Sequence, residues 1–233
     1  LVMSDTSRTW IDVYDFYADV QDLMSFPKDL AEFFWVSDRD GFQHIYRYDY
    51  SGKLLGQVTH GDWSVTRIEG IDTNRRVIYY TGTQASPLQR QLYAIGFDGK
   101  NPRRLTTVPG THHIDMSPDT RYYIDRYSSV SQPARVELWA TNVRALRTLE
   151  DNHSVTAWLA GHEYQPTRIF SFTTSDGAHI DASMVRPTPF DSTRRYPVVF
   201  EVYGGPGSQQ VYDAFNSSGW TEWLSQHGYI VAS

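Results

Sequence analysis

The residues best placed for chemistry follow an apolar run near the C-terminal end of the chain. Tyr196 to Tyr203 predicts a strand that is buried on both faces and leads into the turn Gly204-Gly-Pro-Gly207. Glycines allow the backbone to approach another group without side-chain obstruction. The phenol hydroxyl of Tyr203 is a neutral hydrogen-bond donor at the entrance of this turn. A tyrosine that simply ends a strand above a tight turn also satisfies the spacing.

A serine, an aspartate and a histidine follow this turn in an order that serine hydrolases use. Ser208, Asp213 and His227 have that order, but the chain contains no Gly-x-Ser-x-Gly elbow to expose a nucleophile. We therefore expect these three residues not to be catalytic. We expect His227 at the C-terminus of a helix, where a partial positive charge is favourable.

Two other clusters could suggest a metal site. His112 and His113 lie near Asp115, but neighbouring residues of a strand point to opposite faces, which favours an ordinary polar cluster. The stretch Asp38–Gly41 contains part of a calcium loop without its later ligands, which favours a hairpin turn. We expect no metal and no cofactor.

The composition excludes several classes of function. The net charge is -6 and no basic block occurs, which argues against nucleic acid or an anionic membrane as the main partner. The chain has no cysteine, so disulfides, thiolate metal sites and cysteine nucleophiles are all excluded. The apolar stretches are of strand length, so we expect no transmembrane segment.

The first two thirds of the chain repeat a pattern of short strands separated by turns. Phe34, Ile78 and Tyr123 begin equivalent strands spaced 44 and 45 residues apart, and the turns Ser51-Gly52 and Asp98-Gly99 are 47 residues apart. A period in the forties with four short strands per unit is typical of β-propeller blades. An open all-β sandwich is the alternative.

The chain is therefore predicted to be mainly β with two parts. Residues 1–150 are expected to form the last blades of a propeller, and three blades cannot close a ring, so we expect further blades upstream. Residues 151–233 follow a β-β-β-α-β order after a short helix, which predicts the start of an α/β domain. In this part we expect helices over 154–161 and 217–227, with Asn152 or Ser154 capping the first and Gly228 following the second.

Four segments carry a family resemblance: Trp35–Ile45, Gly61–Val65, Leu149–Asn152 and, most specifically, Tyr203–Pro206. They resemble dipeptidyl peptidase IV and its bacterial relatives within the prolyl oligopeptidase family, and the similarity runs over most of the chain. In that family a β-propeller is joined to an α/β-hydrolase domain. The resemblance implies that the chain covers the last blades and the first strands of the hydrolase.

The resemblance also implies an activity. The parent would be a serine exopeptidase that releases N-terminal dipeptides, Xaa-Pro or Xaa-Ala, from peptides with a free N-terminus. Tyr203 would share the oxyanion hole, and Tyr14 would be an aromatic residue facing the substrate. The family's paired-glutamate anchor is expected upstream, because this chain has no Glu-Glu pair. A homodimer and a periplasmic or secreted location are implied for the parent by resemblance only.

The catalytic serine and its partners are expected beyond Ser233, so the isolated chain is expected to be inactive. Two alternatives remain open. The parent could be a pseudo-peptidase that has lost its serine, whose propeller is an interaction module. It could also be a tripeptidyl or acylaminoacyl peptidase of the same family.

Overall fold

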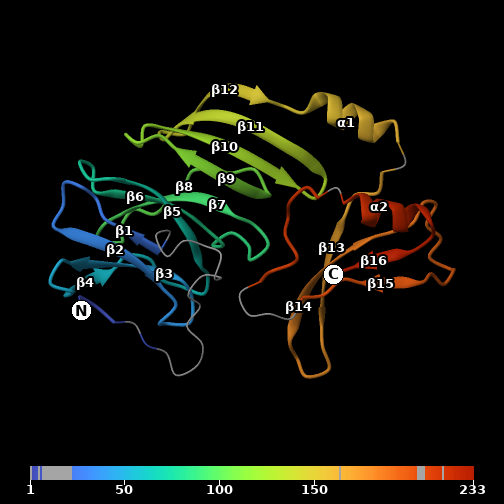
Figure 1. The fold of residues 1–233 in the computed structure, drawn as a ribbon, viewed down its shortest axis with the longest axis horizontal. Coiled ribbons are helices and arrows are strands. Elements are labelled where there is room, and N and C mark those ends of the chain that lie inside the picture. The colour runs from blue at the N-terminus through green and yellow to red at the C-terminus, as the bar shows by residue number, and fades with distance from the viewer. Residues whose placement is uncertain (1, 5, 7–22, 163, 204–207, 217) are drawn as a thin grey trace. The chain divides into compact units, whose positions relative to one another are not determined.

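The computed structural model describes residues 2–4, 6, 23–162, 164–203, 208–216 and 218–233, and the chain forms two compact units (Figure 1). The first unit comprises Leu1–Val108, His112–Arg126 and Val136–Leu149. The second comprises Pro109–Thr111, Tyr127–Arg135 and Glu150–Ser233. No helix of the described residues has the length and apolarity needed to cross a membrane.

Three consecutive antiparallel sheets of four strands each confirm the predicted propeller blades. The first blade contains β1 (Met24–Ser25), β2 (Glu32–Ser37), β3 (His44–Asp49) and β4 (Leu54–Gln57). The second contains β5 (Val65–Asp72), β6 (Val77–Gly82), β7 (Gln91–Gly96) and β8 (Arg103–Arg104). The third contains β9 (Thr111–Met116), β10 (Tyr122–Ser129), β11 (Gln132–Ala140) and β12 (Arg144–Glu150).

The first strand of each blade has a weak sequence pattern, and each has a physical reason for it. β1 is only two residues long. The pairing of β5 with β6 shifts register twice, between Val65 and Arg67 and between Ile68 and Gly70, and such bulges interrupt the alternation of side chains. β9 reads Thr-His-His-Ile-Asp-Met, so its polar residues hide the apolar alternation.

Side chains of alternating orientation fill the space between consecutive blades. Phe34 and Val36 lie on one face of β2 and join a buried cluster with residues of the second blade, whereas Phe33 lies on the opposite face. The ring of Phe34 is fully buried and meets the ring of Phe97 edge-on, with centroids 4.8 Å apart. A second cluster joins Tyr79 and neighbouring residues of the second blade to the third.

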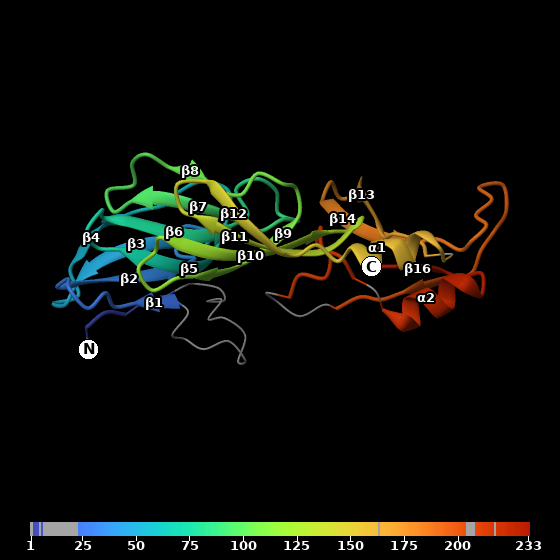
Figure 2. The same cartoon turned by 90° about the horizontal axis from the view of Figure 1, so that it is seen from above.

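The strands β10 and β11 form a long hairpin whose path can be followed in Figure 2. The stem of this hairpin belongs to the first unit, and its tip, Tyr127–Arg135, belongs to the second. Near the tip, the carbonyl oxygen of Ala134 accepts a hydrogen bond from Nδ2 of Asn152. Asn152, one of the two caps that the sequence suggested, is the N-cap of helix α1 (His153–Ala160); its backbone is left-handed and its side chain does not cap the helix.

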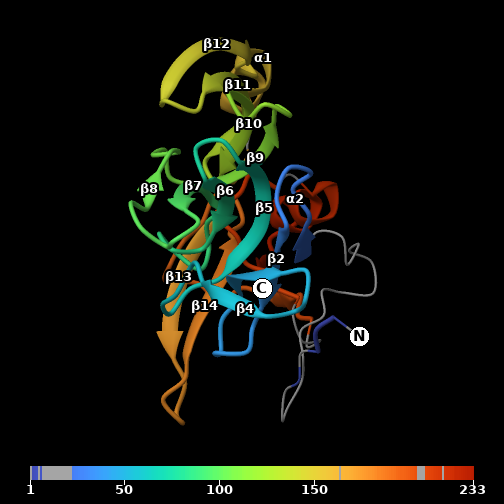
Figure 3. The same ribbon diagram turned by 90° about the vertical axis from the view of Figure 1, so that its left-hand side faces the viewer.

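The second unit contains a mixed sheet in the order β13-β14-β16-β15. Its strands are β13 (Arg168–Thr173), β14 (His179–Val185), β15 (Val198–Phe200) and β16 (Ile230–Ala232). Since β16 pairs with only Met184 and Val185 of β14, most of the β13–β14 hairpin extends past the rest of the sheet (Figure 3). The β-β-β-α-β order follows the predicted one.

Helix α2 spans Gly219–Gln226, within the expected range 217–227, and Gly228 follows it as predicted. Ser218 is its N-cap and accepts a hydrogen bond from the backbone N–H of Thr221, 3.5 Å away. Gly228 follows the C-cap with φ of +85°, the left-handed conformation that glycine adopts most readily. The helix contacts β14 and β16.

The prediction that the apolar run Tyr196–Tyr203 is buried on both faces is wrong. Only Val198–Phe200 forms a strand, and the side chains of Val198 and Phe200 are 43% and 72% exposed. β15 is the edge strand of its sheet, and α2 contacts β14 and β16 instead. An apolar run produces burial only where other elements cover both faces.

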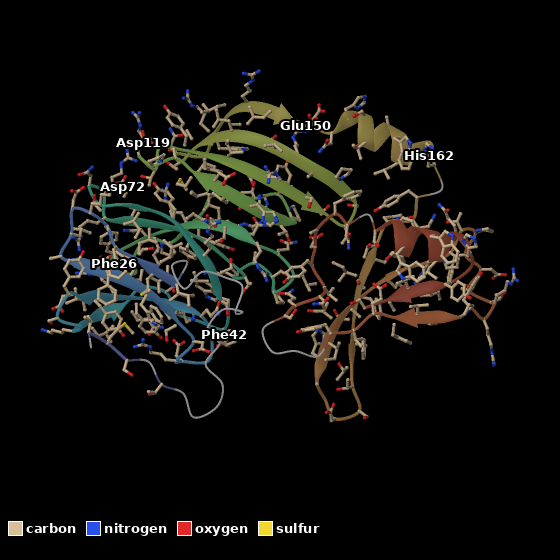
Figure 4. The ribbon with its side chains drawn as sticks, in the orientation of Figure 1. Phe26, Phe42, Asp72, Asp119, Glu150 and His162 are labelled. Carbon is tan, nitrogen blue, oxygen red and sulfur yellow. The ribbon has the colours of Figure 1, made fainter. Side chains whose placement is uncertain are left out.

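We predict that Phe34→Ala destabilises the chain by about 3–5 kcal/mol, because it removes a fully buried ring between two blades. Phe42→Ala is the matched control. Phe42 is 38% exposed in the loop between β2 and β3 (Figure 4), so its removal should cost about 0.5 kcal/mol or less. Urea unfolding of the three proteins measures both values, and equal losses would contradict the assigned core.

Candidate functional site

Parallel pairing holds the segment that leads to Tyr203. β15 and β16 run parallel, with Val198 opposite Ile230 and Phe200 opposite Ala232. The pairing continues one residue further, where the backbone N–H of Glu201 donates to the carbonyl oxygen of Ala232 over 2.8 Å. The backbone is therefore fixed to within two residues of Tyr203.

Tyr203 lies just past the carboxyl edge of this parallel pair. In open α/β sheets, ligands bind outside the carboxyl ends of parallel strands. Tyr203 is 63% exposed. Gly204–Gly207 and the second predicted site residue, Tyr14, lie outside the described residues.

The segment after the turn is attached to the tip of the β10–β11 hairpin. Oδ1 of Asp213 accepts a hydrogen bond from the backbone N–H of Val130 over 3.1 Å. The backbone N–H of Phe215 donates to Oγ of Ser128, also over 3.1 Å. These two bonds connect residues 83 and 87 positions apart in the sequence. They fix the chain ten residues downstream of Tyr203.

The serine, aspartate and histidine that follow the turn are engaged with different partners. Oγ of Ser208 accepts a hydrogen bond from Nε2 of Gln210 over 3.1 Å. His227 lies at the C-cap of α2, as predicted; its Nδ1 donates to the carbonyl oxygen of Trp223 over 2.7 Å, and its ring stacks on that tryptophan. Asp213 accepts from Val130. That these three residues are not catalytic stays a prediction, which rests on the missing elbow.

His112 is part of a buried pair inside the third blade. Its Nδ1 lies 2.9 Å from both carboxylate oxygens of Asp125, and its Nε2 lies 3.0 Å from the carbonyl oxygen of Val108. Burial raises the pKa of Asp125, and the hydrogen bond with His112 opposes that shift. His113 lies on the other face of β9 and is exposed. The hydrogen-bonding groups of the His112–Asp125 pair are therefore satisfied within the blade, and the pair presents no open ligand set.

Asp38 and Asp40 belong to the turn between β2 and β3. The backbone N–H of Gly41 donates to the carbonyl oxygen of Asp38 over 2.8 Å, and Gly41 has φ of +103°. Oδ2 of Asp40 accepts from Nε2 of Gln57 over 2.6 Å. Within the part of the chain that the structure describes, no group of three or more histidine, cysteine or acidic side chains could hold a metal ion.

The contact between the hairpin tip and the post-turn segment is the feature that sequence reasoning missed. Val130 and Ser128 contribute a backbone N–H and a hydroxyl, respectively, and neither belongs to a motif. No local signal in the sequence pairs them with Asp213 and Phe215.

We predict that Asp213→Ala lowers the free energy of unfolding by about 1–3 kcal/mol, because the half-buried N–H of Val130 loses its acceptor. Asp213→Asn retains an oxygen acceptor and should preserve most of the stability. Thermal and urea unfolding compare the two variants. Equal destabilisation by both would show that the carboxylate charge, and not this hydrogen bond, is what matters.

Comparisons with known proteins agree with the fold. A family model described as the dipeptidyl peptidase IV N-terminal region matches residues 1–134. A probable dipeptidyl peptidase 4 of Aspergillus flavus is 30% identical over 202 residues, which cover 84% of this chain and 26% of that protein. A probable dipeptidyl-aminopeptidase B of Aspergillus terreus is 31% identical over 200 residues, which cover 83% of this chain and 22% of that protein.

A solved structure is also similar. The crystal structure of Porphyromonas gingivalis dipeptidyl peptidase 4 matches with a TM-score of 0.88 and 34% identity, covering 98% of this chain and 31% of that chain. The chain thus spans less than a third of the length of each of these relatives. Because the family model matches more than half of the residues, the chain belongs to the dipeptidyl peptidase IV family.

Proposed function

We propose that this chain is part of a serine exopeptidase that releases dipeptides, Xaa-Pro or Xaa-Ala, from the amino end of peptides. The observation that carries the proposal is an exposed tyrosine at the carboxyl edge of a parallel strand pair, in a chain of the dipeptidyl peptidase IV family. The relatives are named dipeptidyl peptidase and dipeptidyl-aminopeptidase, and both names describe release of dipeptides.

In this proposal Tyr203 supplies one donor of the oxyanion hole. When a serine attacks the scissile carbonyl, the carbonyl oxygen becomes an oxyanion. The phenol hydroxyl of Tyr203 donates a hydrogen bond to this oxyanion. The donor needs no proton exchange, because a neutral phenol stabilises the charge through its dipole. The tetrahedral intermediate then collapses: the scissile C–N bond breaks, the remaining peptide leaves as an amine protonated by the triad histidine, and water hydrolyses the acyl-enzyme to release the dipeptide and the free serine.

The two units have separate roles in the proposal. The three blades form part of a propeller that restricts access to small peptides with a free N-terminus. The second unit begins the peptidase domain, with β15 and β16 as parallel strands of its sheet. The 233 residues contain no Gly-x-Ser-x-Gly motif, so the nucleophile comes from another segment of the full-length protein.

We predict that Tyr203→Phe in the full-length protein lowers kcat for Gly-Pro-p-nitroanilide by about 100-fold to 1000-fold and changes KM little. The phenylalanine ring keeps the shape and removes only the donor. Tyr50→Phe, which alters an exposed tyrosine at the end of β3, is the control and should retain full activity. An effect confined to KM would contradict the oxyanion role.

Two further measurements test the class of enzyme. Mass spectrometry of products from unmodified peptides should show dipeptides; tripeptides or acylated residues would instead identify another branch of the family. The 233-residue chain alone should show no turnover of the same substrate, and detectable turnover would contradict the assignment of the nucleophile to another segment.

A further inference from the structure

A cavity of about 360 Å³ lies within the first unit, at the junction of its first two blades. Its walls come from β3, from the turn between β5 and β6, and from the ends of β7 and β8 with the turn between them. Its volume is at the small end of the range for ligand pockets, so it suits a small molecule and not a polymer.

The cavity concentrates positive charge in a chain whose net charge is -6. Five cationic side chains line it: Arg47, Arg75, Arg76, Lys100 and Arg103. Three carboxylates pair with these cations: Glu32, Asp72 and Asp98. The site therefore has an excess of two positive charges.

The paired cations differ in how firmly they are held. Nε of Arg47 lies 2.7 Å from Oε2 of Glu32, and its Nη2 donates to Oε1 over 3.2 Å, so this arginine is neutralised and fixed. The guanidinium of Arg76 is 3.9 Å from the same carboxylate and lies over the ring of Phe97, 4.8 Å from its centroid. A stacked guanidinium retains free N–H groups for a second acceptor.

The outer cations are more accessible. Arg75 lies 3.7 Å from Asp72, which is labelled in Figure 4, and its side chain is 65% exposed. Lys100 lies 3.8 Å from Asp98 and is 77% exposed. Arg103, on β8, is exposed and has no ion pair with the part of the chain that the structure describes. These loose or absent pairs leave donors available to a bound anion.

The turns between β5 and β6 and between β7 and β8 have defined backbone conformations. Arg76 and Asn101 both have positive φ, +53° and +55°, so each turn is held in a conformation uncommon for residues other than glycine. The backbone N–H of Phe97 donates to the carbonyl oxygen of Arg76 over 3.0 Å and joins the two turns. The two turns that carry the cationic side chains are therefore joined by a backbone hydrogen bond.

We propose that this cavity binds a small molecule that carries a phosphate or sulfate group. A phosphate or sulfate group presents at least three terminal oxygens to several guanidinium donors at once, and a phosphate carries up to two negative charges, which match the excess of two positive charges better than chloride or a single carboxylate does. The site is independent of the oxyanion role of Tyr203, because every residue that carries it belongs to the first unit.

Isothermal titration calorimetry of the full-length protein with inorganic phosphate, sulfate and phenyl phosphate tests the proposal. We expect saturable binding that potassium chloride at equal ionic strength does not reproduce. Arg103→Gln should weaken binding about tenfold, because one charge-assisted hydrogen bond is lost. Its melting temperature should not change, since the side chain makes no ion pair with the described residues.

Arg144→Gln is the matched control, because it removes one positive charge from an exposed position on β12 of the third blade. It should change affinity less than twofold. Equal weakening by both variants, or no saturable binding of any probe, would overturn the proposal. Tighter binding of phenyl phosphate than of phosphate identifies an organic phosphate as the ligand, and equal binding identifies the free anion; both results support oxyanion recognition.

Discussion

A four-stranded blade has two faces, and each must be covered before the blade is stable. Phe34 and Ile45 of the first blade meet Ile78 and Tyr80 of the second in one buried cluster. The same requirement produces the repeat of strands and turns along the sequence. The need to cover both faces also places the basic cavity at the junction of the first two blades, where Arg76 packs on Phe97. The basic cavity is thus a consequence of how successive blades pack.

The β10–β11 hairpin contributes residues to both units. Its stem completes the third blade, and its tip binds the segment after Tyr203 through Val130 and Asp213. On the other side of Tyr203, the pairing of β15 with β16 fixes the backbone up to Glu201. Fixed backbone contacts therefore lie two residues before Tyr203 and ten residues after it.

Local signals predicted much of the fold, whereas long-range contacts were beyond them. Ser51-Gly52 and Asp98-Gly99 located two hairpins because their glycines adopt positive φ. β5 was missed because two bulges interrupt its alternation. The expected burial of Val198–Phe200 failed because a sequence shows apolarity but not which elements cover it. Tyr203 is a candidate because of its turn and the family resemblance, whereas no local signal indicated the hydrogen bond between Val130 and Asp213, which are 83 positions apart.

The most direct test of the central claim is the affinity of the full-length protein for a dipeptide boronic acid, which forms a tetrahedral anionic adduct with a catalytic serine. If Tyr203 stabilises the oxyanion, Tyr203→Phe should weaken this inhibitor about 100-fold and leave the affinity for a product dipeptide unchanged. Equal affinity of the wild type and the variant for the boronic acid would contradict the account.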